Sequence, residues 1–201
     1  MRRHGVQVFM EEASIEGKER DLFAVRSQSG KVLGKKLIIA TGSSPAIPPI
    51  PGARENLGDF VLTNREILDL TEIPEKLTVI GGGVIGLEMA AYYAAVGAKV
   101  TVIEMLDHIA GPTDREISNL LQKDLERKGV IFLLSHKCLS VEPGKVWAEA
   151  PSGEKIAVDA DKVLLSIGRR ANIQNLGLET IGVNTNRMGI VTDTRGRTNV
   201  A

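Results

Sequence analysis

The chain of 201 residues has little cysteine: Cys138 stands alone, so no disulfide bond can form within it. A lone cysteine is typical of proteins in a reducing compartment, whereas small secreted domains depend on several disulfide bonds. At this length the chain can bury an apolar core of its own, in one large or two small domains. The scarcity of cysteine argues against a disulfide-stabilised secreted domain and favours a cytoplasmic protein.

An excess of charge of one sign is also absent. The 25 basic and 25 acidic residues cancel, and the pI is near 6.9, which argues against a nucleic-acid or membrane partner recognised through charge. The longest apolar run, residues 77–87, is too short to span a bilayer and is followed by Glu88. Arg2-Arg3-His4 precedes a polar segment rather than the apolar core of a signal peptide.

Glycine is abundant: the chain has 21, where average usage of about 7% predicts about 14. Gly81, Gly83 and Gly86 follow a β-branched, apolar stretch and open an apolar helical pattern that closes at Gly97. In a dinucleotide-binding turn the first glycine bends the chain, the second admits a pyrophosphate and the third lets helix and strand pack closely. We expect that no side chain fits at these three points.

The expected ligand contacts follow from this turn. Unpaired amides and the positive end of the helix dipole near Val84 would meet the phosphate charge. The alternative is an ordinary strand-turn-helix without a ligand. The predicted contacts to the dinucleotide are Gly81, Gly82, Gly83, Val84, Ile85 and Gly86.

Glu104 lies at the end of the next strand, close to the spacing of about 20 residues at which an acid binds the adenosine ribose. A carboxylate there accepts from the ribose hydroxyls and repels a 2′-phosphate. The neighbours Met105, Leu106 and Asp107 include no arginine that could hold such a phosphate. The sequence therefore predicts NAD(H) rather than NADP(H), with an exposed strand-end glutamate as the alternative.

Two stretches of the chain resemble each other. Residues 5–42 and 129–168 each read as a short strand, an antiparallel meander and an apolar strand that ends in glycine. Because the second copy follows the glycine motif, the first copy predicts the back half of another dinucleotide domain. We therefore expect the chain to be part of a longer protein, although chance similarity is an alternative.

The remaining patterns predict an α/β fold with a doubly wound parallel sheet. Thr113-x-x-Glu116 reads as a capping box for a helix that ends at Gly129, and residues 130–134 read as the third parallel strand. Thr63-x-x-Glu66 predicts a short helix after a proline-rich connector at 45–52. The expected apolar face of the helix that begins near 113 is Ile117, Leu120, Leu121 and Leu125.

Several motifs in combination resemble the FAD- and NAD-dependent pyridine nucleotide-disulfide oxidoreductase family. They are Ala40-Thr41-Gly42-Ser43-x-Pro45, Gly81-Gly-Gly-Val-Ile-Gly-Leu-Glu88, Ile167-Gly-Arg-Arg170, Asn175-Leu-Gly-Leu-Glu-x-Ile-Gly182 and the stretch 192–200. The resemblance covers essentially the whole chain. His108-Ile-Ala-Gly-Pro112 and the run 175–178 favour, within the family, the branch that oxidises dihydrolipoamide.

This resemblance implies a Rossmann-like NAD-binding domain with an antiparallel meander in residues 71–190. The back half of a similar FAD-binding domain and a connector would occupy residues 1–70, and residues 191–201 would begin a return to the FAD domain. It places Glu88 toward the nicotinamide, the backbone of Cys138 at the adenine and Gly168 near the nicotinamide. The FAD contacts it implies are Ala13, Thr41, Gly42 and Ser43.

Alternatives stay open for some of these residues. Glu88 could be a first-turn acid that the helix dipole stabilises. Cys138 reads as a small apolar strand residue rather than a redox thiol. Arg169 and Arg170 read as a solvated or ion-paired surface pair.

The resemblance also implies what a whole member contains: a first glycine loop for FAD, a redox cysteine pair, and a dimerisation domain with a His-Glu pair. None of these lies in the present residues, so we assign no catalytic residue and no metal ligand and expect the isolated chain to be inactive. The parent is expected to be a homodimer associated with a 2-oxoacid dehydrogenase complex. The alternatives are a NADH oxidase or ferredoxin-type flavoprotein reductase, or a non-enzymatic NAD-binding module.

The preference for NAD(H) is checked by titrating the protein with NADH and NADPH under the same conditions. We expect weak binding of NADH and still weaker binding of NADPH, because the Glu104 carboxylate would repel a 2′-phosphate. Equal or tighter binding of NADPH would reject the assignment of Glu104 to the ribose.

Overall fold

The computed structural model describes residues 4–200, which divide into two compact units. Pro45–Arg169 form the larger unit, and the residues before and after them form the smaller one. This division differs from the predicted boundaries at 70/71 and 190/191. The connector belongs to the larger unit because β5 (Val61–Leu62), which follows it, pairs with a central strand of that unit.

The larger unit is built on a five-stranded sheet in the order β5-β12-β6-β7-β8, and every neighbouring pair is parallel. Helix α1 (Val84–Ala95) connects β6 to β7, and α2 (Arg115–Arg127) connects β7 to β8. The predicted third parallel strand is therefore present. The other strands of the sheet are β6 (Lys76–Ile80), β7 (Lys99–Ile103), β8 (Ile131–Leu133) and β12 (Lys162–Leu165).

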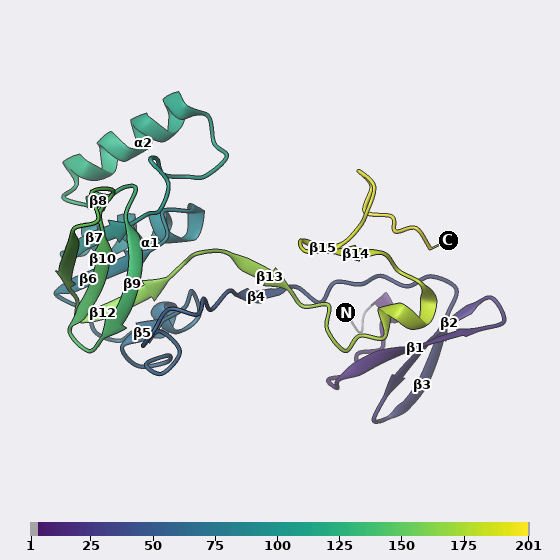
Figure 1. Ribbon diagram of the computed structural model, residues 1–201. Coiled ribbons are helices and arrows are strands. Elements are labelled where there is room, and N and C mark those ends of the chain that lie inside the picture. The colour runs from purple at the N-terminus through teal and green to yellow at the C-terminus, as the bar shows by residue number, and fades with distance from the viewer. Residues whose placement is uncertain (1–3, 201) are drawn as a thin grey trace. The chain divides into compact units, whose positions relative to one another are not determined.

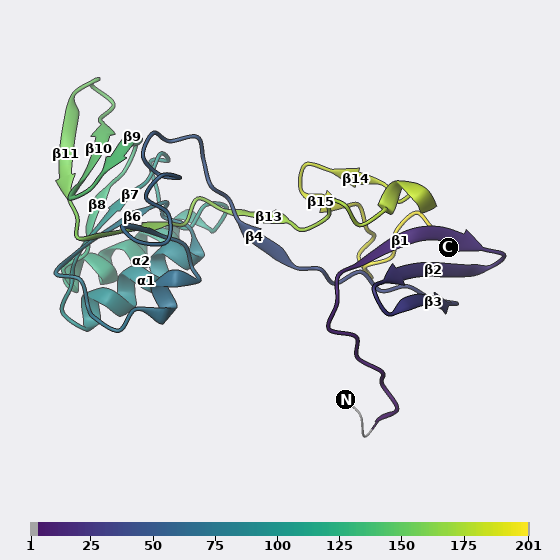
Figure 2. The same ribbon diagram turned by 90° about the horizontal axis from the view of Figure 1, so that it is seen from below.

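Helices and an antiparallel meander cover opposite faces of this sheet (Figure 2). Val79 and Val102 belong to the core on the helical side, whereas Ile80 and Ile103 belong to the core under the meander. The alternation follows from the pleat of a strand, which turns successive side chains to opposite faces. The predicted α/β, Rossmann-like fold with a meander is confirmed. The meander consists of β9 (Lys137–Glu142), β10 (Lys145–Glu149) and β11 (Lys155–Asp159).

Helix α2 begins one residue later than the predicted capping box allows. Asp114, not Thr113, is the N-cap, and its side chain accepts a hydrogen bond from the Glu116 amide at 2.8 Å. An aspartate is the stronger helix-capping residue and its charge suits the dipole, which explains the shift. The predicted end of the helix is confirmed, because the Gly129 amide donates to the Glu126 carbonyl.

The predicted apolar face of α2 is largely wrong. Ile117 is 59% exposed and Leu120 is 62% exposed, whereas Leu125 is buried in the core. Ser118, on the inward side of the helix, is only 1% exposed and its hydroxyl has no hydrogen-bond partner among the described residues. The helix is rotated so that its own apolar stripe only partly meets the sheet.

The predicted short helix before the glycine motif is a 3-10 turn, η2 (Glu66–Asp69). The Thr63 amide donates to Glu66 Oε2 at 2.7 Å, and the Ile67 amide donates to the Thr63 carbonyl. Ile67 is buried in the helical-side core, and its carbonyl accepts from the Tyr93 hydroxyl of α1 at 2.8 Å. This turn therefore anchors the segment that precedes β6.

The smaller unit contains a second antiparallel meander, β1-β2-β3, as the repeat predicts (Figure 1). A 3-10 turn near the end of the chain, η3, contacts β1. Gly177, the residue before this turn, packs directly on the backbone of Ile15. The two passages of chain between the units pair as β4 and β13. The bounds are β1 (Ala13–Glu19), β2 (Leu22–Ser27), β3 (Gly30–Gly34), β4 (Ser43–Pro45), β13 (Arg169–Ala171), η3 (Leu178–Ile181), β14 (Thr185–Asn186) and β15 (Gly189–Ile190).

One expected strand of the repeat does not form. Residues 37–42 pair with no strand among residues 4–200, Gly42 has a left-handed φ of +70°, and Ile38 is 89% exposed. The equivalent stretch of the second copy, β12, pairs with both β5 and β6. A strand needs a hydrogen-bonded neighbour, and the first copy has none here.

No helix in the described part of the chain has the length and apolar character to cross a membrane.

Replacing Ser118 by alanine tests whether the buried hydroxyl destabilises the fold. A buried hydroxyl without a partner costs about 1–3 kcal/mol, and alanine also has the higher helix propensity. We expect Ser118→Ala to raise the free energy of unfolding by about 1 kcal/mol in a urea titration. The exposed Asn119→Ala serves as the control for helix propensity alone, and an equal gain there would contradict this account.

Candidate functional site

A cleft of about 630 Å³ opens at the carboxyl ends of β6, β7 and β12. Between β6 and β12 the strand order changes direction, since β7 and β8 continue on one side and β12 and β5 on the other. Open α/β sheets bind ligands at such a switch point. The cleft is lined mainly by apolar groups and backbone, contributed by the glycine turn, the end of β7, the β8–β9 turn, the segment after β12 and the proline-rich connector.

Two of the three motif glycines are required by the protein itself. Gly81 has a φ of +106°, and a Cβ there would lie 2.7 Å from the Ser166 carbonyl oxygen. A Cβ on Gly86 would overlap both the Gly81 carbonyl oxygen and the Ser166 hydroxyl. The predicted roles of the first and third glycines, a sharp turn and close packing, follow directly from these contacts.

Gly83 is different, and here the expectation that no side chain fits is wrong. Its φ of −80° suits any residue, and a Cβ would meet only the Ser166 carbonyl oxygen at 4.0 Å. Gly83 is the N-cap of α1 without a side-chain cap, and the first helical donor to reach back is the Leu87 amide. The amides of the first turn of α1 therefore have no carbonyl partner within the helix. Gly83, Val84 and Ile85, at this same end of the helix, line the cleft.

Glu104 lies at the predicted place, at the end of β7 and on the wall of the cleft. Its carboxylate accepts from the Gly82 amide at 2.6 Å and from the Leu106 amide at 2.8 Å. Gly82 is buried and is not among the cleft-lining residues. The Gly82 amide thus holds the Glu104 carboxylate in position. The remaining lone pairs of the carboxylate stay open to a ligand.

The other predicted contacts of this unit are divided. Gly168 and Cys138 line the cleft, whereas Glu88 is exposed on α1 and is not part of the lining. Burial raises the pKa of the Cys138 thiol to about 11. A thiol of such high pKa is a poor nucleophile, which agrees with an apolar strand residue rather than a redox group.

Several lining residues were not predicted from the sequence. Ser166 follows β12, and its hydroxyl donates to the Gly81 carbonyl at 2.8 Å. His136 comes from the β8–β9 turn and Lys137 is the first residue of β9, and Arg169 donates to the Asn64 side chain at 2.8 Å. A rule that collects the first residues after every parallel strand finds Ser166. Asn64 reaches the cleft from the short segment that follows β5.

The predicted FAD contacts lie in the smaller unit. Ala13, Thr41 and Gly42 are exposed, and Ser43 is half-buried. Asn172 ties this segment together, since its amide donates to the Gly42 carbonyl at 3.0 Å and its carbonyl accepts from the Thr41 hydroxyl at 2.6 Å. The Ser44 hydroxyl also donates to Asn172 Oδ1. Asn172 was not identified from the sequence.

Comparison with known proteins agrees with this geometry. Residues 1–201 match the profile of the pyridine nucleotide-disulphide oxidoreductase family. The chain belongs to this family. Its relatives include the dihydrolipoyl dehydrogenase of Acholeplasma laidlawii, 36% identical over all of this chain and 58% of that protein. The dihydrolipoamide dehydrogenase of Chaetomium thermophilum is 40% identical over 85% of this chain and 34% of its own length.

Solved structures of family members have the same fold. LpdA of Mycobacterium tuberculosis is 26% identical with a TM-score of 0.83, over 99% of this chain and 44% of that one. The HOCl-induced flavoprotein disulfide reductase RclA of Escherichia coli is 27% identical with a TM-score of 0.82, over 97% of this chain and 44% of that one. The present chain spans between 34% and 58% of the length of these four proteins.

The two classes of glycine are separated by alanine substitution. We expect Gly86→Ala to lower the free energy of unfolding by about 1–3 kcal/mol or more, because the methyl group overlaps backbone that cannot move aside. Gly83→Ala should change it by less than about 1 kcal/mol, the difference between capping residues. Urea titrations of both variants measure this, and equal losses would show that the cleft at Gly83 is closed by the protein itself.

Proposed function

We propose that the larger unit is the NAD(H)-binding domain of a flavoprotein disulfide oxidoreductase. The observation that supports this proposal is the open space at Gly83. The packing of the protein would tolerate a side chain at this position, yet the residue is glycine, and the space lies next to the first-turn amides of α1. A pyrophosphate is the group that such a helix N-terminus accommodates best. Gly81, Gly83, Val84 and Ile85, which line the cleft, remain its proposed contacts, whereas the predicted contacts Gly82 and Gly86 are buried outside the lining.

The two ends of the cleft suit the two ends of the dinucleotide. Glu104 would accept from the adenosine ribose, while Met105, Leu106 and the backbone at Cys138 offer an apolar place for the adenine. At the other end, Gly168 would approach the nicotinamide. Glu88, exposed on α1, would reach the nicotinamide only from outside the lining of the cleft.

NAD(H) rather than NADP(H) is the proposed cofactor. Two amides hold the Glu104 carboxylate at the end of β7, and if the adenosine ribose binds there as proposed, a 2′-phosphate would meet its charge. Two basic residues, Lys137 and Arg169, also line the cleft, and Arg169 donates to the Asn64 side chain. We give the carboxylate more weight because its position is determined by two hydrogen bonds, whereas the Lys137 side chain is exposed.

For the parent protein we propose dihydrolipoamide dehydrogenase activity, with oxidation of dihydrolipoamide by NAD. Relatives in bacteria, a fungus and a plant carry this name at 34–40% identity. FAD would bind the smaller unit at Ala13, Thr41, Gly42 and Ser43, where it would supply the electron carrier between a dithiol and the nicotinamide. A cytoplasmic homodimer, associated with a 2-oxoacid dehydrogenase complex, completes the proposal.

Gly83→Val tests the binding site directly. The valine side chain would occupy the space beside the α1 amides, so we expect calorimetric binding of NAD⁺ to be lost. The variant should remain folded, because its φ is permissive and its nearest neighbour is 4.0 Å from the Cβ.

Ala95→Val is the control, since it places the same valine side chain at an exposed position at the far end of α1. It should bind NAD⁺ as the unaltered protein does. Unchanged affinity of Gly83→Val in a folded protein would overturn the proposed site.

A further inference from the structure

The loop between β7 and α2, residues 105–113, forms one rim of the cleft through Met105, Leu106 and Gly111. Ile109 anchors this loop, because its side chain is fully buried in the helical-side core. The Ala110 amide donates to the Gly82 carbonyl at 2.8 Å. The Gly82 amide donates to the Glu104 carboxylate. Both backbone polar groups of Gly82 are therefore hydrogen-bonded, the amide to Glu104 and the carbonyl to the loop.

The rim is held in an unfavourable backbone conformation. Ala110 has a φ of +62° and Gly111 a φ of +54°, two successive residues in the left-handed region. For alanine this conformation costs about 1 kcal/mol or more, so it persists only where surrounding contacts enforce it. Those contacts therefore determine the position of the rim.

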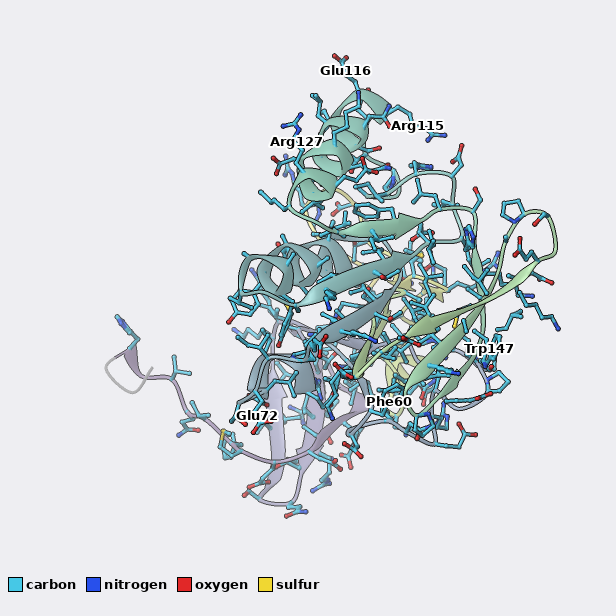
Figure 3. The ribbon with its side chains drawn as sticks, turned by 90° about the vertical axis from the view of Figure 1, so that its left-hand side faces the viewer. Phe60, Glu72, Arg115, Glu116, Arg127 and Trp147 are labelled. Atoms are coloured by element: carbon cyan, nitrogen blue, oxygen red, sulfur yellow. The ribbon has the colours of Figure 1, made fainter. Side chains whose placement is uncertain are left out.

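A chain of three side chains provides such contacts. Arg115, in the first turn of α2 (Figure 3), donates to Asp107 Oδ2 at 2.7 Å. Asp107 Oδ1 lies 2.7 Å from His108 Nδ1, and His108 Nε2 lies 2.9 Å from the carbonyl oxygen of Gly111. The imidazole thus connects the carboxylate to Gly111, the residue that follows the strained Ala110.

Both partners of this imidazole are acceptors. A carbonyl oxygen never donates, and Arg115 followed by His108 lowers the pKa of the Asp107 carboxyl to about 2, so it is ionised at neutral pH. Two hydrogen bonds to two acceptors require a hydrogen on each ring nitrogen, which only the imidazolium has. Neutral His108 would lose one of the two bonds.

We propose that His108 is a positioning residue for the dinucleotide: as an imidazolium it holds Gly111 and the rim against the glycine turn. The proposal rests on the proposed function of the cleft. When His108 loses its proton, the rim loosens and the adenosine end of NAD is held less well. Affinity for NAD should therefore be highest at low pH and fall as the pH rises.

The charged groups around His108 do not reverse the predicted fall in NAD affinity with rising pH. Asp107 touches the ring, and Arg115 touches Asp107. Glu104, at the end of β7, is bound to the Gly82 and Leu106 amides, and Asp114 caps α2 by accepting from Glu116. His136, in the β8–β9 turn, also lines the cleft and is the rival source of a pH effect.

The experiment measures the dissociation constant of NAD⁺ by calorimetry from about pH 5.5 to about pH 8.5, where histidine changes charge. We expect it to rise about threefold to tenfold with pH, the weight of one hydrogen bond. His136→Gln should keep this rise. His108→Gln should abolish it, because an amide does not titrate.

Amide NMR of the protein without ligand provides the second readout. The Ala110 and Gly111 amide signals should shift with pH in the unaltered protein and in His136→Gln, but not in His108→Gln. A pH dependence of binding that survives in His108→Gln, or amides that do not shift, overturns the proposal. Absence of NAD⁺ binding at every pH while both amides still titrate would instead reject the function of the cleft and leave the role of His108 in the rim standing.

Discussion

The close packing of α1 on the end of β6 is the constraint on which the rest of the larger unit depends. Gly86 sits against the Gly81 carbonyl and the Ser166 hydroxyl with no room for a methyl group. This packing aims the start of α1 at the carboxyl edge of the sheet. The unpaired amides, the end of β7 and the segment after β12 then surround one cleft at the switch point of the sheet.

The two faces of the sheet contribute differently to this site. The helical side supplies the α1 amides and, through Ile109, the anchor of the rim loop. The meander side supplies Cys138, Leu165, the turn that carries His136, and Lys137 at the start of β9. Side chains of the core under the meander therefore line the cleft, whereas the helical-side core supports the start of α1 and the rim loop from behind.

Much of the site could be predicted because local backbone demands leave a mark on the sequence. The spacing of Gly81, Gly83 and Gly86 and the acid at the end of the next strand reflect geometry within one β-α-β unit. The apolar face of α2 and the strand at 37–42 were predicted wrongly for the opposite reason. Whether Ile117 is covered, or residues 37–42 are paired, depends on what packs beside them and not on their own periodicity.

The sequence by itself determined the family, the glycine turn and the place of Glu104, since each of these follows from residues close together in the chain. Only the tertiary structure decided which glycines the protein needs for itself, that Asn64 and Ser166 reach the cleft, and that Asp107 and His108 join Arg115 to Gly111. Ser166 meets Gly81 from 85 positions away along the chain. Contacts of that range are set by the order of strands in the sheet, to which no local pattern responds.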